Sequence, residues 1–254
     1  MSVDWRSVAR EAKRDGALHY EIHGEGPLSP ATLAWMDARG KRYSAGTLAR
    51  FEIREAWLTC YELAMKKRRS RWTSRVITMP TDKVVRCYRF TEPKADRWRV
   101  VPTGLSPQWI GNLSGPDVLL CEGEWDCLCA FDRGFVQAAT HTAGAGTWFA
   151  TWTPTFAKKN VTICYDRDRM GMVGAAKLAR ALWPVAASVR IVDLPLPGTP
   201  TSKDLSDFFR QGATHDDFRR LLNGARSYGH SGLRSPGRRH HLPARRPDPV
   251  GVWG

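Results

Sequence analysis

Two stretches of this chain decide its fold: Val118-Leu119-Leu120-Cys121-Glu122-Gly123-Glu124-Trp125-Asp126 and Val161-Thr162-Ile163-Cys164-Tyr165-Asp166-Arg167-Asp168. Each begins as a short apolar run typical of a buried strand and ends in acidic residues. Helical patterns follow at 126–133 and 171–182. Strands that alternate with helices predict an α/β sheet with parallel strands, in which ligands bind beyond the carboxyl ends of the strands. We therefore expect Glu122, Asp166 and Asp168 to lie at one edge of one sheet.

The same alternation continues on both sides of the second stretch. Further strands are predicted at 136–139 and 188–192, with a short helix at 204–210. The aromatic residues Trp148, Trp152 and Phe156 recur every four positions, which predicts a helical stripe packed in the core rather than a platform for stacking bases. The predicted α/β domain spans residues 116–225.

The acidic residues at the two strand ends favour a divalent metal site. The carboxylates of Asp166 and Asp168 are too close in sequence to ionise together comfortably without a cation. Hard ions such as Mg²⁺ take oxygen ligands of this kind. Either motif alone is more often a solvated strand end or a helix cap. Both motifs together, each after an apolar strand and before a helix, favour the metal site, with the three carboxylates within roughly 4–8 Å of one another.

The region before this domain, residues 1–115, predicts an α+β subdomain. Helical patterns occupy 33–39 and 44–51, and Ser44 suits the N-cap of the second. Two β-like runs, 75–79 and 84–90, flank a predicted turn at 81–83. In the second run, Arg86 and Arg89 alternate with apolar residues, which fits either a basic face toward nucleic acid or a plain solvated face. A basic run that includes Lys67, Arg68 and Arg69 precedes the hairpin.

Charge is concentrated at the two ends of the chain. The net charge is +14, of which residues 1–117 carry +8, residues 118–225 carry +1 and residues 226–254 carry +5. Basic flanks of this kind attract polyanions. The last segment, 226–254, is rich in Arg, Pro, Gly and His and is expected to be a disordered basic tail.

The six cysteines have no zinc-site spacing, and neither a signal peptide nor a membrane span is predicted. We therefore expect a cytoplasmic protein without a membrane partner.

At this point the motifs resemble a known domain. Glu122-Gly123-x-x-Asp126, the loop at 144–147, Asp166-x-Asp168-x-x-Gly171 and Lys203-Asp204 are similar to the Toprim domain of DnaG-type primases, phage primase-helicases, topoisomerases and OLD-type nucleases. Upstream, Arg39-Gly40 and the segment 44–51 resemble the opening of the primase catalytic core, although Lys41-Arg42-Tyr43 replaces the isoleucine of that motif. The primase zinc ribbon and the helicase phosphate-binding loop have no counterpart in this sequence.

The resemblance implies a Toprim-like parallel sheet flanked by helices and a role for each motif residue. Glu122, Asp166, Asp168 and Asp204 would hold Mg²⁺ or Mn²⁺, and Lys203 would contact a triphosphate, although Lys203 also fits a surface lysine and Asp204 an N-cap. Asp126 would orient its loop or cap its helix rather than bind metal directly. The nucleic-acid contacts would come from Arg86, Arg89, Lys67, Arg68 and Arg69.

The implied activity is primase-like synthesis of short RNA primers from nucleoside triphosphates on a single-stranded DNA template. The resemblance also implies a replicative helicase, encoded separately, as a partner, and the expected origin is a phage or a mobile element. Two alternatives remain open: a Toprim nuclease, and a catalytically silent module that binds single-stranded DNA. Template-dependent incorporation of nucleotides separates the first reading from the other two.

Overall fold

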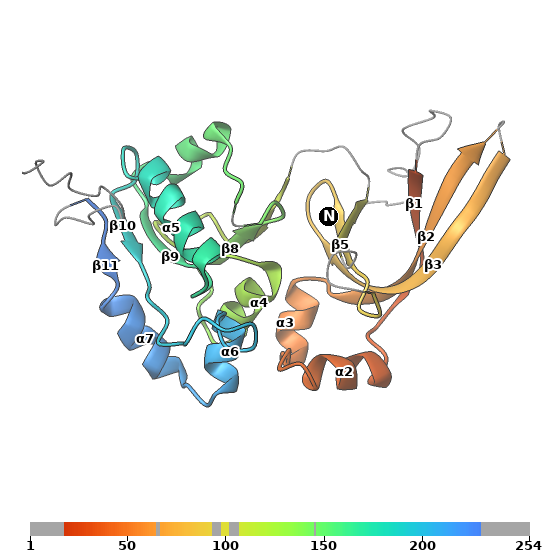
Figure 1. The fold of residues 1–254 in the computed structure, drawn as a ribbon, viewed down its shortest axis with the longest axis horizontal. Coiled ribbons are helices and arrows are strands. Elements are labelled where there is room, and N and C mark those ends of the chain that lie inside the picture. The colour runs from red at the N-terminus through yellow and green to blue at the C-terminus, as the bar shows by residue number, and fades with distance from the viewer. Residues whose placement is uncertain (1–17, 65–66, 93–97, 102–106, 145, 230–254) are drawn as a thin grey trace, which may run out of the picture.

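The chain forms two β-sheets that lie side by side (Figure 1). The computed structural model describes residues 18–64, 67–92, 98–101, 107–144 and 146–229. We refer to residues 18–101 as the N-terminal unit and to residues 107–229 as the C-terminal unit. The polar helical segment expected near the start of the chain and most of the expected tail lie outside the described residues. None of the helices in the described part is long and apolar enough to cross a membrane.

The N-terminal unit is an antiparallel sheet with strand order β1-β2-β3-β4-β5. Its strands are β1 (Leu18–Gly26), β2 (Arg54–Ala64), β3 (Lys67–Pro80), β4 (Val85–Tyr88) and β5 (Trp98–Val101). The predicted hairpin is confirmed as β3 and β4, although β3 begins eight residues earlier than expected. The strands β1 and β2 were not predicted, because their charged and aromatic residues give no continuous apolar run.

Two short helices connect β1 to β2. They are α2 (Pro30–Asp37) and α3 (Ala45–Arg50). The predicted N-cap of α3 is confirmed, because the Ser44 hydroxyl accepts a hydrogen bond from the Thr47 N–H at 3.2 Å. This bond satisfies one of the backbone donors that the first turn of a helix leaves free.

The C-terminal unit has strand order β11-β10-β9-β7-β8-β6. These strands are β6 (Trp109–Gly111), β7 (Asp117–Cys121), β8 (Ala138–His141), β9 (Asn160–Cys164), β10 (Ser188–Ile191) and β11 (Arg226–Ser227). The four central strands are parallel, as predicted, and Cys121 of β7 is level with Cys164 of β9. The sheet is mixed rather than purely parallel, because β6 and β11 pair antiparallel at its two edges.

Three boundaries differ from the expected ones. Strand β6 belongs to this sheet although its residues precede 116. Strand β11 occupies the first residues of the expected tail. The strand expected at 136–139 begins at Ala138, because Phe135 turns into the core and leaves the Val136 side chain 54% exposed. A turn in which the Ala138 N–H donates to the Phe135 carbonyl precedes the strand.

Helices cover both faces of the second sheet (Figure 1). One face packs against α4 (Glu124–Asp132), α6 (Leu205–Arg210) and α7 (His215–Asn223), and α7 was not predicted. The other face packs against α5 (Arg169–Leu182) and the 3₁₀ helix η2 (Ala150–Phe156). Phe156 is fully buried and Trp148 packs against the same cluster, which confirms the predicted core role of these residues. Trp148 precedes η2, which is a 3₁₀ helix, so the three aromatic residues do not form the α-helical stripe that their spacing predicted.

The two units meet along α4. The Tyr43 ring stacks on Trp125, and the Phe51 ring packs edge-on against Phe131. The Ser44 N–H donates to an Asp132 carboxylate oxygen at 2.8 Å. These contacts run along α4 and hold the N-terminal unit beside the end of β7. The acidic residues that begin at Glu122 follow this end of the strand, and we call the sheet edge that they occupy the acidic edge.

Candidate active site

Aligned strands bring the acidic motifs together at one edge of the second sheet. Glu122 directly follows β7, and Asp166 lies just after β9, the strand that pairs with β7 in register. Oε2 of Glu122 accepts a hydrogen bond from the Asp166 N–H at 3.0 Å. The prediction that the two motifs share one edge of a parallel sheet is therefore confirmed.

Gly171 allows this close approach. It lies in the first turn of α5, and a Cβ atom there would lie 2.3 Å from the Asp166 carbonyl oxygen and 2.7 Å from Oε2 of Glu122. Both distances are far below van der Waals contact, so only glycine fits between the two acidic residues. Gly123, by contrast, has an extended backbone, and a Cβ atom there would be 3.8 Å from the nearest atom.

Lys203 lies between the two aspartates of the second motif. Its Nζ is 2.8 Å from Oδ2 of Asp166 and 2.5 Å from Oδ2 of Asp168. The other oxygen of Asp168, Oδ1, accepts a hydrogen bond from the Gly171 N–H at 2.9 Å and caps α5. The interpretation of Lys203 as only a surface lysine is wrong, since the lysine side chain is 21% exposed and paired with both carboxylates.

Burial and mutual charge shift the pKa values of this cluster in different directions. Burial and the nearby charge of Asp166 raise the pKa of Glu122 to about 7. Burial also raises the pKa of Asp166, although Lys203 opposes the effect. Burial alone would raise the pKa of Asp168, but hydrogen bonds from Gly171 and Lys203 hold it below its ordinary value. The edge thus combines a carboxyl that titrates near neutrality with one that stays ionised.

Asp126 and Asp204 have structural bonds beside this cluster. Oδ1 of Asp126 accepts hydrogen bonds from the Ser206 backbone N–H at 3.1 Å and from the Ser206 hydroxyl at 2.9 Å, which ties α4 to α6. Oδ1 of Asp204 accepts from the Asp207 N–H at 2.6 Å in a capping box. Burial raises the pKa of Asp204, as do the charges of Asp207 and Asp166. Asp204 is therefore the N-cap of α6, and its carboxylate also interacts electrostatically with Asp166 at the acidic edge.

Lys41 is a site residue that sequence reasoning missed. It comes from the N-terminal unit, and its Nζ lies 4.8 Å from the centroid of the Trp125 ring. Burial lowers the pKa of Lys41, whereas the charges of Asp126 and Asp204 oppose that shift. The sequence position of Lys41 could have indicated this role, because Lys41 follows Gly40 at the point where the primase motif has an isoleucine.

The donor set suits a hard divalent cation. It offers carboxylate oxygens from two strand ends, and a positive charge, the Lys203 ammonium, already lies between Asp166 and Asp168. Among the described residues, no group of three or more His, Cys, Asp or Glu side chains is arranged to hold a metal ion as the structure stands. The carboxylate oxygens are therefore suitable ligands for such an ion, but in the structure the Lys203 ammonium lies between Asp166 and Asp168.

Arg86 and Arg89 do not form the exposed basic face that sequence analysis expected. The Arg86 guanidinium pairs with Glu124 at 2.6 Å and lies over the Trp98 ring. The Arg86 side chain is only 11% exposed, and Glu124 is buried. Arg89 is also buried, over the Trp72 ring and 3.1 Å from Glu92. Both arginines pack on an aromatic ring and pair with a carboxylate. These are tertiary contacts, which the alternation of basic and apolar residues along the strand does not reveal.

The remaining basic residues expected to contact nucleic acid, Lys67, Arg68 and Arg69, begin β3. They lie at the end of the β2–β3 hairpin that points away from the second sheet (Figure 1). The structure therefore does not bring them to the acidic edge.

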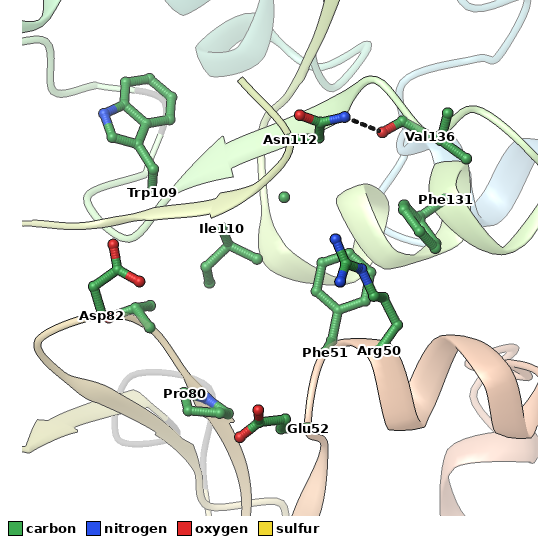
Figure 2. Close-up of a pocket in the computed structure, with 12 residues that line it drawn as sticks. Arg50, Phe51, Glu52, Pro80, Asp82, Trp109, Ile110, Asn112, Phe131 and Val136 are labelled. Atoms are coloured by element: carbon green, nitrogen blue, oxygen red, sulfur yellow. Dashed lines mark hydrogen bonds between the residues drawn. The ribbon is translucent and has the colours of Figure 1, made fainter. Parts of the chain in front are cut away.

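A cavity of about 410 Å³ lies between the two units (Figure 2). Its walls come from the end of α3, the β3–β4 turn, β6 and the end of α4, with Arg50, Glu52 and Asp82 as its charged side chains. None of the site residues expected from the sequence lines it. The candidate site is thus the open carboxylate edge, not this cavity.

Comparison with known proteins places the fold. No family model matches the chain, and no curated protein matches it by sequence. Solved structures do match: a DNA primase domain from Pseudomonas aeruginosa has a TM-score of 0.60 at 15% identity, covering 78% of this chain and 74% of that one. A DnaG primase catalytic domain bound to single-stranded DNA has a TM-score of 0.58 at 16% identity, with 79% and 74% covered.

The zinc-binding and RNA polymerase domains of the Aquifex aeolicus primase match with a TM-score of 0.59 at 15% identity. That match covers 79% of this chain, which spans only 57% of the Aquifex chain. At these identities the likeness shows the fold, and the fold is that of a primase catalytic core.

Proposed function

With the fold of a primase catalytic core as the premise, we propose that this protein is a primase-like nucleotidyltransferase. It would join nucleoside triphosphates into a short RNA primer on single-stranded DNA, with Mg²⁺ or Mn²⁺ as cofactor. The observation that carries the proposal is the convergence of Glu122, Asp166, Asp168 and Lys203 at the carboxyl edge of β7 and β9.

The residues of this edge have separate tasks in the proposed reaction. Glu122, Asp166 and Asp168 would hold the divalent ions, with Asp204 as a further carboxylate beside them. Bound there, such ions supply activation of a primer hydroxyl and stabilisation of charge on the phosphates. The Asp166 N–H orients Glu122, and the Gly171 N–H orients Asp168, so the carboxylates are positioned before any substrate arrives. Lys203 offers the positive charge that a triphosphate requires.

A basic surface for the template forms the second part of the proposal. Arg86 is paired with Glu124 and only 11% exposed, and Arg89 is buried. We therefore assign contact with template phosphates to the start of β3, at Lys67, Arg68 and Arg69, away from the acidic edge. Contacts with phosphates release counterions and make affinity fall as salt rises. Replacing all three residues by glutamine should weaken binding to single-stranded DNA and reduce its salt dependence. Unchanged binding would show that other residues contact the template. The separate helicase, the cytoplasmic location and the phage or mobile-element origin remain predictions.

The decisive test is incorporation of labelled ribonucleotides on a single-stranded template with Mg²⁺ or Mn²⁺. We expect template-dependent products from the wild-type protein and at least a hundredfold loss in Asp166→Asn or Asp168→Asn. Asp117→Asn is the matched control, since that exposed carboxylate lies at the opposite end of β7 and accepts a hydrogen bond from the Asn160 side chain.

The same assay distinguishes the alternatives. Metal-dependent shortening of the labelled DNA, without incorporation, would support the nuclease. Binding to DNA with neither reaction would support the silent module. Full incorporation by the Asp166→Asn/Asp168→Asn double variant would refute the assigned site.

A further inference from the structure

Both carboxylates of the Asp166/Asp168 motif already share a cation. Lys203 Nζ lies within hydrogen-bond distance of one oxygen from each, in the position that an ion shared by both would occupy. Lysine is usually a flexible, solvated charge. Here its side chain is only 21% exposed, so its position needs a structural reason.

Backbone contacts hold Lys203 in this place. The Arg167 N–H, between the two aspartates, donates to the Lys203 carbonyl oxygen at 2.7 Å. The Lys203 N–H in turn donates to Oδ2 of Asp207 at 2.9 Å. The preceding loop also rests on Arg167, because Gly198 has a φ of +77° and a Cβ there would lie 2.9 Å from the Arg167 carbonyl oxygen. The loop and the motif are thus docked on each other, and the ammonium reaches both carboxylates.

Both oxygens of Asp168 already have hydrogen-bond partners. Oδ1 caps α5 through the Gly171 N–H, and Oδ2 is bound by Lys203. A divalent ion sits about 2.1 Å from its oxygen ligands, so an ion on Oδ2 would lie less than about 5 Å from Nζ of Lys203. Two positive charges that close in a half-buried site repel each other strongly. A divalent ion on Oδ2 of Asp168 therefore competes with the Lys203 ammonium for that position.

We propose that Lys203 is an internal counterion that exchanges with the divalent metal. Without metal, its ammonium holds Asp166 and Asp168 together. Metal loading displaces the ammonium from both carboxylates and frees it to face the phosphates of an incoming nucleotide. This inference rests on the metal site of the proposed function, and it adds that lysine and metal compete for the same oxygens.

Chemical labelling of lysine tests the displacement directly on the full-length protein. Reductive methylation, read by peptide mass spectrometry, should modify Lys203 slowly without metal and at least fivefold faster with saturating Mn²⁺. Lys177, exposed on α5, is the internal control and should react at the same rate in both conditions. A Lys203 rate that does not change at metal saturation would overturn the exchange.

Metal affinity gives a second readout that needs no catalysis. Titration calorimetry with Mn²⁺ should show at least tenfold tighter binding to Lys203→Met than to the wild type, because no ammonium must be displaced. Lys203→Arg keeps the charge and should bind Mn²⁺ weakly, like the wild type, and Lys177→Met should be unchanged. Melting temperatures confirm that each variant is folded.

The outcomes separate this inference from the proposed function. If wild-type protein and Lys203→Met both fail to bind Mn²⁺, the metal site itself is refuted. If the wild type binds Mn²⁺ but Lys203→Met binds no more tightly, the exchange is refuted and the metal site stands.

Discussion

In metal-free buffer, replacing Glu122 with glutamine should stabilise the protein at pH 8 relative to wild type and have much less effect at pH 5. Burial and the charge of Asp166 raise the pKa of Glu122 from 4.5 to about 7 in the folded state. The folded protein therefore binds more protons than the unfolded chain between these two pH values. Its free energy of unfolding must fall as pH rises through that window.

The size of the effect follows from the shift. A difference of about 2.5 pKa units corresponds to about 3 kcal/mol at pH 8, as an upper bound because Glu122 is only partly buried. Glutamine carries no charge, and its side-chain oxygen keeps the bond from the Asp166 N–H. The variant should therefore lack this part of the pH dependence.

Urea unfolding followed by tryptophan fluorescence, at pH 5 and pH 8 with a chelator, measures the difference. Glu25→Gln, at an exposed glutamate of β1, controls for a general charge effect. A change in stability that is equal at the two pH values would refute the reasoning, because it would show that the Glu122 charge is not penalised in the folded state. Saturating Mn²⁺ should abolish the advantage of the variant, since a bound cation compensates the carboxylate.

Other substitutions probe the contacts around the edge. Arg86→Met leaves Glu124 buried without its partner, and urea unfolding should show a loss of about 3–5 kcal/mol; a loss below about 1 kcal/mol would contradict the buried pair. Gly171→Ala places a methyl group 2.7 Å from Oε2 of Glu122 and should reduce Mn²⁺ affinity at least tenfold in calorimetry, whereas Gly123→Ala should keep it. Ser44→Ala removes the cap of α3 and should lower the free energy of unfolding by about 1 kcal/mol, with no change in Mn²⁺ affinity.

The sequence predicted the part of the fold that local patterns determine. Apolar runs of four or five residues at β7 and β9 end in acidic residues, and parallel pairing places those ends together without further information. The capping residue Ser44 and the core role of Phe156 followed from local patterns, although the helix that ends at Phe156 is a 3₁₀ helix rather than the α-helix that the spacing predicted. Helix α7 carried a similar signal that was overlooked, because Thr214 and Asp217 form a capping box.

Contacts between distant segments were beyond the reach of such patterns. Arg86 alternates with apolar neighbours in the manner of a surface strand, yet its partner Glu124 lies 38 residues away on α4. The position of Lys203 between Asp166 and Asp168 depends on a docked loop, and sequence spacing cannot report it. The strands β1 and β2 pair along long, partly polar faces, so tertiary context rather than an apolar run determines them.

The short strand β11 determines where this chain can be shortened. Arg226 and Ser227 cover the outer edge of β10, the Tyr228 N–H donates to the Val189 carbonyl oxygen, and Gly229 packs against the Trp183 ring. A truncation before Arg226 would leave the backbone groups of β10 open, and an open strand edge is a template for pairing with another molecule. Shortened versions that end after Gly229 should stay monodisperse, while those that end at Ala225 should self-associate as concentration rises.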